Sequence, residues 1–362
     1  MTQNTRDRLL KESFTREDLV DLLSADEAGS RLIFEKAAQV KKEYVGNKVY
    51  FRGLIEYSNI CSKNCYYCGI RSHNTRYTRY QLTDGEVLEA ARYAFENKFA
   101  SIVIQSGERS DEKFIARIEY LLKEIRQMAG GSLHITLSLG EQSEETYLRW
   151  FSAGAHRYLL RIEVSSPELY KKLHSADSRH DYSQRLEALK TLRRIGYQTG
   201  TGVMIGLPFQ TLPDLADDLL FFRDFDIDMV GMGPYIEHEE TPLYQYRDQL
   251  LSLPERLHLS LKMVALTRII MKDINIAATT AMQTINPRGR EMAIRAGANV
   301  MMPNLTPVKY KQNYLLYRNK PGIEDDAEET RSVMEKNIRD AGDEIGYNEW
   351  GDPRHFTKRT GK

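Results

Sequence analysis

Short apolar runs recur between residues 50 and 302, and amphipathic patterns with helical spacing separate most of them. Each run has the length and composition of a strand buried on both faces of a parallel sheet. The eight runs are Tyr50–Tyr57, Ser101–Gln105, His134–Leu139, Tyr158–Ile162, Gly200–Ile205, Met229–Gly233, Asn275–Thr279 and Asn299–Met302. Their alternation with helices predicts an α/β fold, a complete (β/α)8 TIM-type barrel. The alternative is an open doubly wound sheet, but no phosphate-binding Gly-x-Gly-x-x-Gly follows the first run.

Helix-start signals support the same division of the chain. Capping boxes at Thr15–Asp18, Thr83–Glu86 and Thr211–Asp214 each precede an apolar pattern with helical spacing. The first lies in a stretch that contains no strand pattern. We therefore expect a helical prelude before the alternation begins.

The C-terminal part is less regular than the centre. A polar helix is predicted from Asp325 to Arg339, and a frayed basic tail after it. Because no convincing linker interrupts the chain, residues 1–362 are expected to form a single domain. It would comprise a helical N-terminal extension at 1–46, the barrel at 47–317, and a C-terminal helix and tail at 318–362.

Charge and hydropathy argue against several classes of protein. Lys and Arg together number 51, equal to the 51 Asp and Glu, so nothing favours a nucleic acid or an anionic membrane as partner. No run of about 18 apolar residues is present. Residues 1–8 lack the apolar stretch of a secretory signal. We expect a cytoplasmic protein that does not enter the membrane.

The only three cysteines, Cys61, Cys65 and Cys68, fall within eight residues. Their spacing, Cys-x₃-Cys-x-aromatic-Cys, places three soft thiolates on one short loop. Three thiolates can hold three irons of a four-iron, four-sulfur cluster and leave the fourth iron without a protein ligand. An open coordination site indicates chemistry at the cluster rather than electron carriage.

Two other interpretations of the cysteines stay open. Zinc needs four ligands, and His73 lies five residues after Cys68. The first cysteine spacing is wider than in a usual zinc knuckle, however, and no second cysteine pair follows. Three buried, inert cysteines would not be expected to cluster on one polar loop. An odd, clustered set also argues against disulfides and for a reducing compartment.

The loops after the strands are the expected place of the active site in a β/α barrel. The cysteine loop directly follows the first predicted strand. The second strand ends with Gln105 and Glu108, and the third carries Thr136 and Ser138. A carboxylate such as Glu108 could hold an ammonium group, although Ser-Gly-Glu taken alone is more often a plain turn.

The fourth predicted strand carries Arg157, Arg161 and Glu163 on one face, because they lie at alternate positions. Charges on the inner face of a barrel are costly unless they are paired or bind a ligand. Structural pairing of Arg161 with Glu163 is the alternative to ligand binding.

The later strands supply a turn at Gly206 and Leu207 and a set of hydroxyl, aromatic and thioether side chains. A methionine at such a position is more often core than ligand. The members of this set are Met229, Thr279, Thr280, Met302, Tyr314 and Tyr317.

The cysteine loop after a first barrel strand, with aromatic Tyr67, resembles the signature of radical S-adenosylmethionine (SAM) enzymes. Within them, the chain resembles the HydE-type [FeFe]-hydrogenase maturases over roughly residues 15 to 317. Methylornithine synthase and biotin synthase share the arm or the cluster loop. The matching segments are Tyr44–Val49, Glu56–Cys61, Gln105–Glu108, Leu137–Glu141, Arg157–Arg161, Met204–Pro208, Ala278–Met282 and Asn299–Asn304.

Two departures from the radical SAM pattern matter. The usual Gly-Gly-Glu is Ser106-Gly107-Glu108 here, a mild change. Some members of the maturase family carry three more cysteines near the C-terminus for an accessory cluster, and the sequence after Tyr317 has none. We therefore expect a single [4Fe-4S] cluster and no second one.

The resemblance implies roles for the matching residues. The three cysteines would ligate the cluster, whose open iron would bind the amino and carboxylate groups of SAM. Gln105 and Glu108 would orient the methionine part, and Ser138 belongs to the same site. Tyr67 and the Gly206–Leu207 turn would lie near the adenine. Glu163 would accept hydrogen bonds from the ribose, and Arg185 would lie near the methionine carboxylate.

The resemblance also implies a substrate cavity. Its expected lining is Thr136, Arg157, Arg161, Met229, Thr279, Thr280, Met302, Tyr314 and Tyr317. Two arginines indicate an anionic or carboxylate-bearing substrate. In the family this is a small-molecule or organometallic species, a cysteine-bound iron carbonyl–cyanide unit.

The partners implied are a tyrosine-cleaving radical SAM maturase, a GTPase scaffold maturase and an external electron donor. Two alternative functions stay open: radical chemistry on an amino acid, as in methylornithine synthase, and a metallocluster carrier or zinc-stabilised binding protein without turnover.

Overall fold

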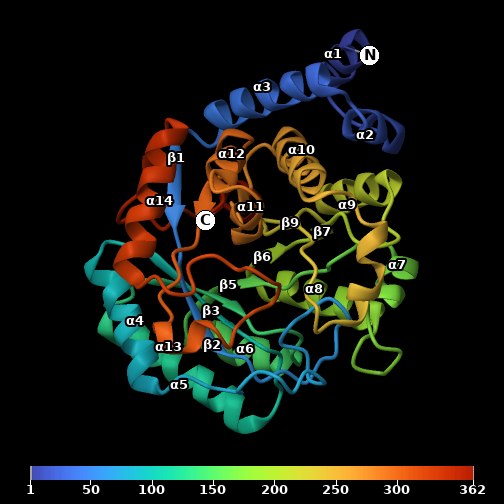
Figure 1. The fold of residues 1–362 in the computed structure, drawn as a ribbon. Helices are drawn as coiled ribbons and strands as arrows, with labels where there is room; N and C mark the ends of the chain where they lie inside the picture. Colours follow the sequence, from blue (N-terminus) through green and yellow to red (C-terminus); the bar gives the residue numbers. More distant parts are fainter. Residues whose placement is uncertain (1, 362) are drawn as a thin grey trace.

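A computed structural model describes residues 2–361 and shows strands and helices alternating from residue 48 onward (Figure 1). The strands are β1 (Lys48–Phe51), β2 (Gly53–Ser58), β3 (Ser101–Ser106), β4 (His134–Ser138), β5 (Ala155–Leu159), β6 (Gln198–Thr201), β7 (Met204–Ile205), β8 (Met229–Val230), β9 (Gly233–Pro234), β10 (Asn275–Ile276), β11 (Val300–Met301) and β12 (Glu344–Ile345). All strand pairings between these elements are parallel.

The helices lie at the N-terminus, between the strands and at the C-terminus. They are α1 (Thr2–Leu9), α2 (Arg16–Leu23), α3 (Glu27–Tyr44), α4 (Asp84–Glu96), α5 (Glu112–Met128), α6 (Glu144–Ala153), α7 (Pro167–Leu173), α8 (Tyr182–Ile195), α9 (Leu212–Phe225), α10 (Leu253–Met271), α11 (Thr280–Ile285), α12 (Gly289–Arg295), α13 (Val308–Lys311), α14 (Ala327–Ala341) and α15 (Arg354–Thr360). A 3-10 helix, η1, spans Pro242–Gln249.

The main sheet contains seven parallel strands in the order β10-β8-β6-β5-β4-β3-β2. It curls, and the connecting helices cover its outer face (Figure 1). In register, Val103 pairs with Thr136, and Thr136 pairs with Arg157. The carboxyl ends of these strands lie together at one edge, which brings the loops that follow them into one place.

The expectation of a complete, closed eight-stranded barrel is wrong: the main sheet is an open, curled half-barrel. The first predicted strand divides at Arg52 into β1 and β2. While β2 pairs with β3, β1 pairs with β11 and β12 in a separate three-stranded sheet. The eighth predicted strand is only the two residues of β11. It meets the main sheet through isolated bridges, Ala277–Val300 beside β10 and Leu54–Asn304 beside β2.

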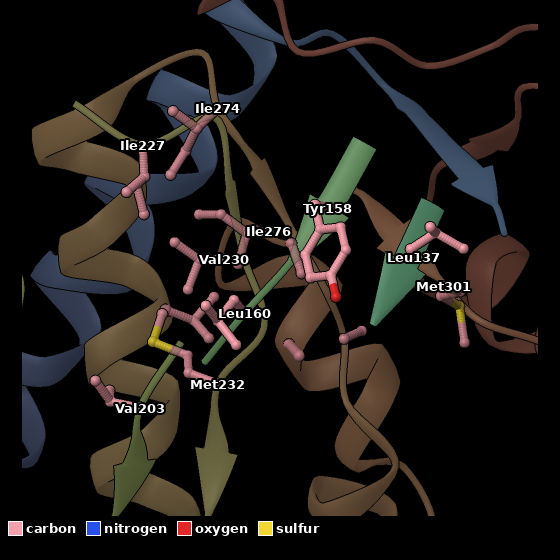
Figure 2. Packing of buried hydrophobic residues seen from close by; sticks show 14 of the residues in the cluster. Leu137, Tyr158, Leu160, Val203, Ile227, Val230, Met232, Ile274, Ile276 and Met301 are labelled. Atoms are coloured by element: carbon pink, nitrogen blue, oxygen red, sulfur yellow. The ribbon is translucent and has the colours of Figure 1, made fainter. Parts of the chain in front are cut away.

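Successive strand residues face opposite sides of the sheet. On β5, Tyr158 points away from the sheet interior and packs against Tyr147 of α6, with ring centroids 5.1 Å apart. Figure 2 shows the apolar residues of this layer, among them Leu137, Val230 and Ile276, each fully or almost fully buried. Each such aliphatic side chain contributes about 1.5–3 kcal/mol relative to exposure.

The N-terminal extension is helical, as predicted, and covers the outside of the fold. Capping boxes start α2 at Thr15, α4 at Thr83 and α9 at Thr211, all three at the predicted positions. Helix α3 lies across α10, and α2 lies against α9 (Figure 1). Helix α10 is buried on nearly all sides because α3 covers the face that would otherwise meet solvent.

The C-terminal segment is more ordered than expected. The predicted polar helix is α14, but residues 354–360 form a further helix, α15, instead of a frayed tail; Lys362 lies outside the described residues. His355 bonds to Asp226 and Asp273, with its Nδ1 3.0 Å from Asp273 Oδ1. Acidic side chains in the loops that precede β8 and β10 therefore hold this basic helix in place. None of the helices within residues 2–361 is long and apolar enough to cross a bilayer.

Candidate cofactor and substrate site

A cavity of about 330 Å³ opens at the carboxyl ends of the strands. Polar side chains from the loops after β2 to β5 meet there with residues from the C-terminal third of the chain. Most of the residues predicted for the site line it: Cys61, Cys65, Tyr67, Cys68, Gln105, Glu108, Ser138, Arg161, Glu163, Arg185, Thr279, Thr280, Met302, Tyr314 and Tyr317. The strand ends thus bring together side chains more than 250 residues apart.

The three cysteines come from the loop after β2. The Glu108 N–H donates to Cys61 Sγ at 3.3 Å, which fixes this sulfur against the loop that follows β3. Gly107 permits the approach, because a Cβ there would lie 2.4 Å from the Ile60 carbonyl oxygen. Burial raises the pKa of all three thiols, that of Cys68 to about 12. Without a bound metal the three thiols are therefore protonated. A bound metal would displace these protons.

This donor set fits an iron–sulfur cluster better than a zinc ion. Thiolates are soft ligands suited to such clusters, and all three line one cavity. Within residues 2–361, no three His, Cys, Asp or Glu side chains surround one point as a single ion would require. His73, the fourth ligand that zinc would need, is exposed. In a cluster each thiolate binds a different iron, so the sulfurs need not converge.

The connection between α7 and α8 holds the cysteine loop in place. The Tyr66 N–H donates to the Leu173 carbonyl at 2.9 Å, and the Asn64 N–H donates to His180 Nε2 at 3.0 Å. The Arg179 guanidinium donates to the Ser62 carbonyl at 2.8 Å. The cysteine loop is thus held by residues 173–180, more than 100 residues further along the chain. No motif in the sequence indicates these contacts.

Tyr67 is oriented by a histidine from the same connection. Burial lowers the pKa of His174 to about 3, so the ring is neutral. Its Nδ1 lies 2.8 Å from the Tyr170 carbonyl and must carry the proton. Nε2 therefore accepts a hydrogen bond from the Tyr67 hydroxyl at 3.1 Å.

Two carboxylates and two cations form a buried network beside the cysteines. Lys63 Nζ lies 3.2 Å from Glu108 and 3.0 Å from Glu141. Arg185 pairs with Glu141 and lies 3.9 Å from Glu108. Burial raises the pKa of Glu108, because its effect there outweighs that of the two cations. At Glu141 the effect of Arg185 and Lys63 outweighs that of burial, so the pKa of this carboxyl group is lowered. Gly140 has φ +78°, and a Cβ there would overlap Glu108.

Arg161 and Glu163 are paired, with Nε and Oε2 3.1 Å apart, and both line the cavity. The ion pair between Arg161 and Glu163, the alternative to ligand binding, is thus formed. Both side chains also line the cavity, where a ligand can reach them. Glu163 adopts φ +69°, a left-handed conformation that is uncommon outside glycine. Its N–H and carbonyl bond to Gly202 and Met204, which hold the backbone in this shape.

The opposite wall comes from the C-terminal third of the chain. Gln105 Nε2 donates to the Tyr314 hydroxyl at 3.2 Å, and Thr279 donates to the Met232 carbonyl at 3.1 Å. Lys320 pairs with Glu56, and both line the cavity. Sequence reasoning missed Glu56, Lys63 and Lys320 as cavity residues. Glu56 and Lys63 lie within or beside identified motifs, the segment Glu56–Cys61 and the cysteine loop, whereas nothing in the sequence pointed to Lys320.

Thr136, Arg157 and Met229 do not line the cavity, contrary to expectation. Arg157 is fully buried and pairs with Asp352 of the C-terminal segment, with its Nε also 3.0 Å from Gln198 Oε1. Arg157 precedes Arg161 by four residues, roughly 13 Å along a strand, and so lies at a deeper level. Thr136 pairs with it in register, and Met229 Sδ accepts a hydrogen bond from buried Arg52.

Gly206 and Leu207 also lie away from the cavity. They line a separate groove together with residues of α9 and α10. Their N–H groups donate to the Gln210 side chain at 2.7 and 3.2 Å. The turn after β7 is therefore closed by the side chain of Gln210, just before α9 begins, and Gly206 and Leu207 do not line the cavity in which the adenine was expected.

Comparisons with known proteins agree with this site. A model of the Radical SAM superfamily matches residues 55–222, which include the three cysteines. The [FeFe] hydrogenase maturase subunit HydE of Thermotoga maritima is 46% identical over 316 residues, 87% of each chain. The 3-methylornithine synthase of Methanosarcina barkeri is 26% identical over 302 residues, covering 81% of this chain and 80% of its own.

Solved structures share the fold. Methylornithine synthase superposes with a TM-score of 0.79 over 95% of this chain and 98% of its own, at 23% identity. The [FeFe]-hydrogenase maturase HydG superposes with a TM-score of 0.81 over 99% of this chain and 80% of its own, at 20% identity. The identity with the Thermotoga maritima protein, over most of both chains, decides the relationship. The chain belongs to the radical SAM superfamily and, within it, to the family of HydE-type [FeFe]-hydrogenase maturases.

Proposed function

We propose that this chain is a radical SAM enzyme that acts in the maturation of the [FeFe]-hydrogenase di-iron centre. The observation that carries the proposal is the placement of all three cysteines in one cavity, in a chain 46% identical to a HydE maturase. The proposed resident cofactors are one [4Fe-4S] cluster and SAM. When bound and reduced, the cluster would supply one electron to the sulfonium of SAM, whose S–C5′ bond would break to give methionine and a 5′-deoxyadenosyl radical.

Residues of the cavity have distinct proposed tasks toward SAM. Cys61, Cys65 and Cys68 would hold three irons and leave one free for the methionine amino and carboxylate groups. Glu108, partly neutralised by Lys63, presents an acceptor for the ammonium, and Arg185 a donor for the carboxylate.

The nucleoside part of SAM has its own proposed contacts. Glu163 offers oxygens to the ribose, and Tyr67, held by His174, faces the adenine. Gln105 and Ser138 complete the lining on the β3 and β4 side. Gly206 and Leu207 take no part, because the groove that they line is a different one.

The inner part of the cavity is the proposed substrate site. Arg161, Thr279, Thr280, Met302, Tyr314 and Tyr317 line it. A guanidinium and several hydroxyls favour an anionic or carboxylate-bearing substrate, small-molecule or organometallic. Enclosure by loops excludes water and stray hydrogen donors from a radical.

The proposed partners follow from the family. They are a tyrosine-cleaving radical SAM maturase that precedes this step, a GTPase scaffold maturase that follows it, and an external electron donor.

Release of 5′-deoxyadenosine tests the enzyme class. Anaerobic incubation of the fully loaded protein with SAM and a strong reductant should produce it. Cys65→Ala should lose the cluster and this activity together, whereas Thr75→Ala, exposed beside the same loop, should retain both. No release from protein with a full cluster would reject the class.

The second candidate is radical rearrangement of an amino acid. The 26% identity to 3-methylornithine synthase over most of both chains favours it. A lysine-dependent product in the same anaerobic assay would support it over hydrogenase maturation. Metal analysis separates both from a binding protein without turnover, since zinc without iron and sulfide would support only the latter.

A further inference from the structure

Arg290 of α12 is a buried cation without a carboxylate partner. It is 6% exposed, and its Nη2 donates to Thr280 Oγ1 at 2.8 Å. Its Nε is buried and has no hydrogen-bond partner. Within residues 2–361 no carboxylate oxygen lies within 4.0 Å of it, although Arg288 and Arg295 on the same helix both pair with Glu291.

The charge on Arg290 persists at neutral pH. Burial lowers the pKa of the guanidinium to about 10, which still leaves it protonated. The ionisable side chain that acts on it most is Tyr317, whose phenol is neutral because burial raises its pKa. An isolated buried cation is unfavourable unless a counter-ion or a set of acceptors compensates it.

A small chamber adjoins this guanidinium. It measures about 40 Å³ and is lined by residues of α11, α12, α14 and the segment around Lys320. One water needs roughly 10–15 Å³ on this scale, so the chamber has room for a halide or a carboxylate group. Thr330 Oγ1, also on its wall, is buried without a partner. Lys320 is already paired with Glu56, and Asp325 makes no ion pair with Arg290.

The chamber and the main cavity share part of their lining. Leu54, Thr280, Met302 and Lys320 line both spaces. The Thr280 oxygen accepts a hydrogen bond from Arg290, and the Thr280 side chain also hydrogen-bonds to the Tyr317 phenol on the cavity wall. Thr280 therefore links a buried positive charge to the proposed substrate site.

We propose that Arg290, with Thr280 and Thr330 as polar neighbours, forms a binding site for a small anion in this chamber. The ligand is an inorganic anion or the carboxylate group of a small molecule. A neutral water would satisfy the free N–H but would leave the charge uncompensated. The site depends neither on the cluster nor on SAM cleavage, so its failure would leave the proposed function standing.

Bromide is the probe for the site, because its anomalous scattering identifies it in a crystal. Crystals of the full chain with its cluster are soaked in sodium bromide. We expect an anomalous peak within hydrogen-bond distance of the Arg290 guanidinium. The peak should disappear in Arg290→Gln and remain in Arg295→Gln, the matched control on the exposed face of α12. Absence of the peak in the wild type would overturn the proposal, as would its persistence in Arg290→Gln.

A solution measurement covers the case in which Arg290→Gln does not fold. The unfolding midpoint is followed as bromide replaces gluconate at constant ionic strength. It should rise and saturate for the wild type and Arg295→Gln. In Arg290→Lys the bromide concentration that gives half of this rise should be at least about tenfold higher, because charged hydrogen bonds from the guanidinium are lost. Equal responses in wild type and Arg290→Lys would contradict the site. Competition by formate would show that carboxylates are accepted, whereas saturation by bromide alone would restrict the site to inorganic anions.

Discussion

Lys63 shows how much of the candidate site depends on a single residue. It is 5% exposed and lies between Glu108 and Glu141, two residues from each of two cysteines. A lysine between cysteines reads from sequence as a solvated loop residue. Its role is visible only once the loops after β3 and β4 bring both carboxylates to it.

Replacing Lys63 tests this network. In Lys63→Met, Glu108 and Glu141 would face each other with only Arg185 to compensate them. Removing one partner from a buried charge cluster costs about 3 kcal/mol of unfolding free energy. Lys123→Met, which removes an exposed pair with Glu119, should cost at most about 0.5 kcal/mol. Urea unfolding at neutral pH measures both variants, and equal losses would contradict a buried network.

Gly107 offers a second test beside the cysteines. In Gly107→Ala the new methyl group would overlap the Ile60 carbonyl and approach Cys61, so the cysteine loop must shift. We expect a loss of about 1–3 kcal/mol and a lower iron content after reconstitution. Gly85→Ala is the control, because nothing lies within 4 Å of that position and it is in a helix. It should be neutral or stabilising by up to about 1 kcal/mol. Full iron content in Gly107→Ala would show that the loop tolerates the shift.

At the scale of elements, local patterns determined the helices and central strands well. Capping boxes placed the starts of α2, α4 and α9, because side-chain hydrogen bonds at a helix N-terminus involve only neighbouring residues. The strand predicted at residues 50–57 divides at Arg52, which local pattern does not reveal. The division depends on which partners β1 and β2 find: β2 pairs with β3, the next strand along the chain, whereas β1 pairs with β11 and β12 from the C-terminal part.

Helix α15 yields a prediction about pH. Hydrogen bonds to Asp273 and Asp226 raise the pKa of His355 above its usual value. A raised folded-state pKa contributes stability that is fully present below the unfolded value of about 6.5 and is lost as pH rises through the folded value. His355→Gln should therefore destabilise the protein more at pH 5.5 than at pH 9. Unfolding free energies of wild type and variant at both pH values test this. A difference independent of pH would show that His355 docks the helix as a neutral ring.

At the scale of the whole molecule, the site combines local motifs with contacts that sequence spacing does not encode. The cysteine loop and the acidic ends of β3 and β4 were identifiable because each follows a strand. The pairs Arg157–Asp352 and Glu56–Lys320 join residues far apart in sequence and decide which charges are available to a ligand. Arg157 was expected in the cavity because it shares a strand face with Arg161 and Glu163. The C-terminal segment supplies that partner.

The open, curled sheet has the same origin. Eight apolar runs indicated eight strands. Closure of the barrel, however, requires the last strand to pair along both edges of the main sheet, β10 and β2. Val300 and Met301 pair with β1, and the contact with β10 is a single bridge. The segment after β11 turns into the loop that carries Asn304 beside Leu54, so the two edges of the curled sheet approach without forming a continuous ladder.

The central claim is a [4Fe-4S] cluster held by Cys61, Cys65 and Cys68, with one iron free to bind SAM in the cavity. The most direct measurement is the electron paramagnetic resonance spectrum of the reduced, fully loaded chain before and after SAM is added. We predict about four irons per chain, one cluster signal, and a changed signal once SAM binds the free iron. A spectrum that SAM leaves unchanged, from protein with a full cluster, would contradict the claim, as would a second cluster signal.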